Sequence, residues 1–140
     1  MSELLYSFIG ADQMFVTADQ ILAHLVGDFL LQSHWMATEK TRNSLAAATH
    51  ALVYACCFIP ITGLGPAAAW AWLGILIPHF FIDRFRLARF VVWAKNGARG
   101  PVTATGYTDD VPAWLSVWLL IVADNTLHLL TNGLVLWRLA

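Results

Sequence analysis

The chain has 140 residues, of which 59% are hydrophobic and 12% charged, and its formal net charge is -1. A soluble domain usually carries about 25% charged residues, so this composition argues against an ordinary soluble domain. We expect a single domain surrounded by membrane lipids, with no nucleic acid as a partner.

The hydrophobic pattern predicts an all-α fold, an integral membrane bundle of four transmembrane helices. Residues 1–15 are too short to span and are expected to lie at the membrane interface. The predicted spans are residues 17–35, 45–62, 67–86 and 112–138. The connections at 36–44 and 87–111 are basic, which places both in the cytoplasm and both termini on the other side of the membrane.

The first predicted span carries polar side chains at every fourth position. His24, Asp28 and Gln32 recur at this spacing. At about 100° per residue they occupy one stripe of the helix. Because an unsatisfied polar group costs several kcal/mol in lipid, we expect the other helices to supply partners.

The other predicted spans carry polar residues that can meet this requirement. Three His/Asp pairs recur at i,i+4, a spacing that places both side chains on one helix face. These pairs are His24/Asp28, His79/Asp83 and Asp124/His128, and the second span adds His50. Counted from the predicted cytoplasmic ends of the helices, His24, Asp28, His50 and His79 lie at a similar depth of roughly 9 to 15 Å.

One interpretation of this set is a metal site. Imidazole and carboxylate are good ligands for Zn or Mn, and a cation would neutralise the buried carboxylates. We expect four metal ligands, His24, Asp28, His79 and Asp83. Three further side chains would complete the coordination shell of the metal or act as general acid/base, namely His50, Asp124 and His128. The reaction would be hydrolysis of a lipid-linked or amphiphilic substrate. Either one ion or two could bind.

Two other interpretations stay open. The buried groups could form a proton or ion relay. They could also specify helix packing in a non-catalytic membrane subunit that binds a partner protein or a second copy of the chain. Three intramembrane carboxylates are costly for that purpose, at about 2.5 to 3.5 kcal/mol each at the bilayer centre.

The motif from His24 to Gln32, followed by Trp35, Lys40 and His50, resembles the family catalogued as domain of unknown function 3307. The segments 79–83 and 124–128 are similar to its two later motifs, although Asn125 stands where Gln is expected. The resemblance implies a protein of the bacterial cytoplasmic membrane and names no reaction. A weaker similarity, limited to His-x-x-x-Asp patterns, is to membrane-bound metal-dependent hydrolases.

Overall fold

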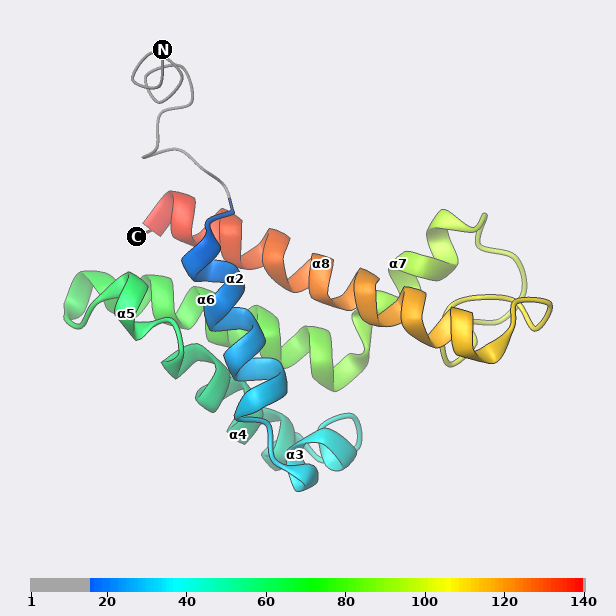
Figure 1. The fold of residues 1–140 in the computed structure, drawn as a ribbon, viewed down its shortest axis with the longest axis horizontal. Helices are drawn as coiled ribbons and strands as arrows, with labels where there is room; N and C mark the ends of the chain where they lie inside the picture. The colour runs from blue at the N-terminus through cyan, green and yellow to red at the C-terminus, as the bar shows by residue number, and fades with distance from the viewer. Residues whose placement is uncertain (1–15, 140) are drawn as a thin grey trace, which may run out of the picture.

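A computed structural model describes residues 16–139, and every regular element within this range is helical (Figure 1). The prediction of an all-α fold is therefore confirmed. The segment expected at the membrane interface, residues 1–15, lies outside the described residues. The elements are α2 (Ala18–Leu25), the π-helix η2 (Val26–Leu30), α3 (His34–Glu39), α4 (Ser44–Cys56), α5 (Ile59–Thr62), α6 (Pro66–Phe85), α7 (Leu87–Lys95) and α8 (Ala113–Leu139).

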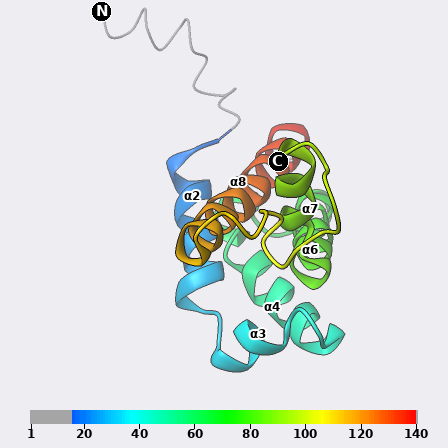
Figure 2. The same ribbon diagram turned by 90° about the vertical axis from the view of Figure 1, so that its right-hand side faces the viewer.

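Four helical segments form a closed ring, made of α2 with η2, α4, α6 and α8. Helix α4 packs against η2 and α6, α6 also packs against α8, and α8 returns to α2. Viewed from its end, the molecule shows these segments arranged around a common centre, with α3 below and α7 beside α8 (Figure 2). Four alanines of α4, Ala46, Ala47, Ala51 and Ala55, are fully buried, which allows its neighbours to approach closely.

The first segment begins as an α-helix and continues as a π-helix from Val26. Thr17 caps α2 by accepting a hydrogen bond from the Gln20 amide at 3.2 Å. At Val26 the helix widens into the π-turn η2, and the Leu31 amide donates to the Val26 carbonyl at 2.9 Å. Such π-turns occur frequently at functional sites. Here the π-turn carries Asp28.

The first segment ends at Leu30, earlier than the residue 35 expected from the hydrophobic pattern. Ser33 caps a new helix, α3, by accepting from the Met36 amide, so α3 occupies part of the connection expected at 36–44. Gln32 therefore lies between two helices rather than on the stripe that His24 and Asp28 share.

The basic segment after α6 also contains a helix. Helix α6 ends at Phe85, and Arg86 adopts a left-handed backbone conformation with a φ of 53° that redirects the chain into α7. Helix α7 packs against α8. Gly106, with a φ of 78°, lets the following loop lie directly against the Arg89 carbonyl. Arg86 and Arg89 are thereby held at one end of the ring.

Among the described helices, α8 alone is long and apolar enough to cross a membrane, with 27 residues. The prediction of four membrane-spanning helices is not supported by the lengths and compositions of the others. Helix α4 has only 13 residues, and the first segment is interrupted after Leu30. Helix α6 has 20 residues, but its last turns carry His79, Asp83 and Arg84. A straight span needs about 20 predominantly apolar residues.

Polar side chains gather inside the ring, and large apolar side chains face outward. The buried polar residues are Gln20, His24, Asp28, His50, His79, Asp83, Ser116, His128 and Asn132. By contrast, Leu30, Trp70 and Trp114 are 74%, 69% and 68% exposed. Tyr54, Phe58 and Ile75 belong to a buried apolar core beside the polar residues, but charged groups are seldom buried in a soluble domain.

Candidate metal centre

Four side chains from three segments converge at the centre of the ring. They are Asp28 from η2, His50 from α4, and His79 and Asp83 from α6, and all are buried. One ligand atom from each lies within 4.8 Å of the others. The i,i+4 spacing places the two α6 residues on one helix face, and α4 brings His50 to them because it packs between η2 and α6.

The distances among these atoms match a four-coordinate ion. The His50 Nε2 atom lies 3.0 Å from Asp28 Oδ1, from Asp83 Oδ2 and from His79 Nε2. The His79 Nε2 atom lies 3.5 Å from Asp28 Oδ1 and 3.2 Å from Asp83 Oδ2. Zinc bonds of about 2.0 to 2.1 Å in a tetrahedron give ligand separations of roughly 3.3 Å. The four residues therefore fit a divalent ion such as zinc.

Hydrogen bonding alone does not satisfy this arrangement. The His50 Nε2 atom can carry one proton, yet it faces two carboxylates and the second imidazole. A cation among the four atoms would interact favourably with all of them. The Nδ1 atoms of His50 and His79 have no hydrogen-bond partner among the described residues, so they lack the acceptor that usually supports a metal-bound imidazole.

Lys40 brings a positive charge to the same atoms. Its Nζ atom donates to Asp83 Oδ2 at 2.8 Å and lies 3.3 Å from His50 Nε2. The lysine side chain retains 18% exposure, whereas the Asp83 side chain retains 4%. The ammonium group compensates part of the negative charge that Asp28 and Asp83 bring into the ring.

The structure places His24 beside the ligand set rather than within it. Its Nδ1 atom lies 2.8 Å from the Tyr54 hydroxyl and 3.3 Å from Asp28 Oδ2. Its Nε2 atom lies 2.6 Å from Asn125 Oδ1. Both ring nitrogens therefore have protein partners, and His50 occupies the position among the ligand atoms that the sequence pattern assigns to His24.

Asp124 and His128 lie on the other side of Asp83. The His128 Nε2 atom is 3.7 Å from Asp83 Oδ1, and the Asp124 side chain is 32% exposed. Gln32 lines the adjacent cavity, and its buried Oε1 atom has no hydrogen-bond partner within the described range. The structure thus brings all the candidate residues from the sequence into one neighbourhood.

Sequence reasoning did not identify Tyr54, which lies at the centre of this neighbourhood. Its ring stacks on His79 with centroids 3.6 Å apart, and its hydroxyl accepts a hydrogen bond from Asn132 at 2.6 Å. The i,i+4 spacing could have indicated both residues, since Tyr54 follows His50 and Asn132 follows His128 by four positions. Tyr54 holds His24 and His79 in place.

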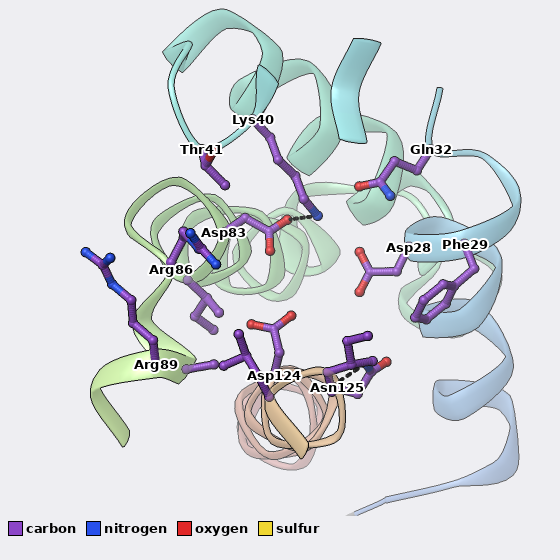
Figure 3. A pocket seen from close by; sticks show the side chains of 14 residues that line it. Asp28, Phe29, Gln32, Lys40, Thr41, Asp83, Arg86, Arg89, Asp124 and Asn125 are labelled. Atoms are coloured by element: carbon purple, nitrogen blue, oxygen red, sulfur yellow. Dashed lines mark hydrogen bonds and ion pairs between the residues drawn. The ribbon is translucent and has the colours of Figure 1, made fainter. Parts of the chain in front are cut away.

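A cavity of about 210 Å³ opens beside the cluster. Asp28, Asp83 and Asp124 line it together with Lys40, Arg86 and Arg89. Figure 3 shows the three carboxylates directed toward the same space, with Lys40 reaching Asp83. The cavity therefore combines candidate metal ligands with positively charged side chains.

A family profile described as "Protein of unknown function (DUF3307)" matches residues 16–132. The chain belongs to the DUF3307 family. The matched range contains every residue of the candidate metal centre of this DUF3307 chain. Searches of curated proteins and of solved structures gave no match. The similarity to membrane-bound metal-dependent hydrolases is accordingly not shown by these comparisons.

Proposed function

We propose that this DUF3307 protein is a membrane-embedded, metal-dependent hydrolase. The observation that carries the proposal is the convergence of Asp28, His50, His79 and Asp83 beside an open cavity. Zinc or manganese bound by these residues would supply Lewis acidity and an activated water for hydrolysis. The buried ring excludes bulk water, so charges inside it interact more strongly than they would at the surface.

The cavity lining favours an amphiphilic substrate with an anionic headgroup. Lys40 and Arg86 provide positive charge for a phosphate or carboxylate group. Phe29 and Ile121 line the same cavity and are 59% and 39% exposed, so an apolar part of the substrate can extend along them toward the outer surface. A lipid-linked ester combines both properties.

The outward-facing apolar side chains support a membrane location for the ring. Exposed residues of this kind lie on α2, α6 and α8, and so many large exposed apolar side chains are typical of contact with lipid or another protein. In this arrangement the basic end, with Lys40 and Arg86, faces the cytoplasm. The cavity would open there.

Membrane fractionation tests this location. The protein should remain in the pellet after alkaline carbonate extraction, and an alkaline phosphatase fused after residue 140 should be active, because both termini are proposed to lie outside the cytoplasm. Release by carbonate would refute the membrane embedding. An inactive phosphatase fusion, together with an active cytoplasmic reporter at the same position, would refute the topology.

Metal content and hydrolysis test the centre itself. Protein grown with added zinc or manganese should retain stoichiometric metal and hydrolyse at least one of three chromogenic probes in micelles, a phosphate monoester, a phosphate diester or a carboxylic ester. His50→Ala and Asp28→Asn should lose both properties. His34→Ala is the matched control, because His34 is exposed on α3 and lies outside the cluster. Absence of bound metal in the wild type would refute the proposal.

A second candidate is a non-catalytic membrane subunit whose buried network specifies helix packing. The Lys40–Asp83 ion pair favours it, because it partly compensates the buried charge without an ion. In that case His79→Ala lowers thermal stability or assembly, the wild type binds no metal, and no probe is hydrolysed. Metal analysis therefore separates the two candidates.

A further inference from the structure

We propose that a second divalent cation binds between Asp83, Asp124 and His128, and that this second position receives the phosphate group of a phosphorylated amphiphile. The inference rests on the proposed function, since it needs the first ion at Asp28, His50, His79 and Asp83. One ligand atom from each of the three residues lies within 4.8 Å of the others.

Asp83 is placed to bridge two ions. Its Oδ2 atom faces His50 and His79, at 3.0 and 3.2 Å from their Nε2 atoms. Its Oδ1 atom instead faces His128 Nε2 at 3.7 Å. A carboxylate with one oxygen in each ligand set joins the centres of two-metal sites, where the ions lie about 3.5 to 4 Å apart.

The second observation is the unpartnered nitrogen of His128. The residue is fully buried, and its Nδ1 atom donates to the Asp124 carbonyl at 2.9 Å, which leaves Nε2 unprotonated in the neutral ring. This Nε2 atom has no hydrogen-bond partner among the described residues and faces a carboxylate oxygen. Two lone pairs directed at one another repel unless a cation lies between them. A backbone carbonyl on Nδ1 is also the usual support for a metal-bound imidazole.

The two positions differ in access. The first set supplies four protein ligands, all buried, of which Asp28 and Asp83 also line the cavity. The second set supplies three ligands, and Asp124 belongs to the cavity wall with a side chain that is 32% exposed. An ion there retains coordination positions that face the cavity, which is the property of catalytic sites.

The charge balance indicates the substrate class. Asp28, Asp83 and Asp124 carry -3 in total, whereas Lys40, Arg86, Arg89 and two divalent ions carry +7, which leaves +4 at the cavity wall. A phosphate monoester dianion carries the opposite charge. Arg86 lines the same cavity, and its guanidinium, which donates one hydrogen bond to the Ala104 carbonyl at 3.0 Å, retains further donors for the phosphate oxygens. A carboxylic ester group is uncharged, so it has no negative charge to pair with the positive cavity wall.

Metal stoichiometry tests the second site independently of activity. Detergent-purified protein loaded with Mn²⁺ and freed of unbound metal should contain two ions per chain by elemental mass spectrometry. Asp124→Asn and His128→Ala should each retain one. Asp109→Asn, an exposed carboxylate in the loop before α8, is the matched control and should retain two. Electron paramagnetic resonance of the wild type should show an exchange-coupled manganese pair.

The outcomes separate this inference from the proposed function. A wild type with one ion, lost in His50→Ala and retained in His128→Ala, would overturn the second site and leave the hydrolase proposal standing. A wild type without metal would overturn both. If the variants fail to fold, the wild-type spectrum decides, because isolated Mn²⁺ signals at two equivalents would overturn the paired site.

Discussion

Replacing Lys40 by methionine removes the ammonium group that lies 2.8 Å from Asp83 Oδ2 and keeps the length of the side chain. Breaking a buried ion pair by removing one partner costs about 3 to 5 kcal/mol. Because the Lys40 side chain is 18% exposed, solvent screening reduces the expected cost to about 2 to 3 kcal/mol. At about 3 to 4 °C per kcal/mol for a chain of this size, Lys40→Met should lower the melting temperature in EDTA by roughly 6 to 12 °C.

Zinc should reverse this loss. The ion would compensate the same carboxylates, and the ammonium group would no longer compete for Asp83 Oδ2, so excess zinc should restore most of the melting temperature of the variant. The measurement is scanning fluorimetry of detergent-solubilised protein with EDTA or with zinc. Lys95→Met is the control, since Lys95 is exposed at the end of α7 and should change neither value. An unchanged melting temperature of Lys40→Met in EDTA, or no recovery with zinc, would refute the reasoning.

Three further substitutions address packing and binding. In Gly27→Ala the new Cβ would lie 2.7 Å from Tyr54 Cδ2, so thermal unfolding should report a loss of about 1 to 3 kcal/mol, and an unchanged value would show that η2 can move away from α4. Tyr54→Phe removes the hydroxyl beside His24 Nδ1 and should cost about 1 to 3 kcal/mol while metal content is retained, whereas loss of metal would contradict a purely supporting role. Arg86→Gln should weaken inhibition by inorganic phosphate about tenfold or more in the hydrolysis assay without changing metal content, and equal inhibition would exclude this side chain from headgroup binding.

Local geometry made several features of this protein predictable from the sequence. A low charge content and long apolar runs indicated a helical domain whose apolar residues face outward. The first predicted span was to begin at residue 17, and Thr17 caps α2 in the structure. The spacing of His79 and Asp83 placed both on one face of α6, because four residues return a helix to nearly the same direction.

The identity of the ligand set depended on contacts between segments distant in the sequence. His24 and His50 are chemically alike, and only the packing of α4 between η2 and α6 brings His50 to the ligand atoms while Tyr54 and Asn125 bind His24. Lys40 could not be assigned to the site from its loop position, because the ion pair with Asp83 spans 43 residues.

The sequence by itself determined the residue types of the centre and their faces, since helical periodicity fixes the direction of a side chain relative to its own axis. Tertiary structure decided the rest. The π-turn at Val26 and the new helix begun at Ser33 removed Gln32 from the stripe that a uniform helix would have continued. The rotation and depth of each helix in the ring then set which nitrogen meets which carboxylate. These quantities follow from packing against neighbouring helices, which no periodicity within a single segment can specify.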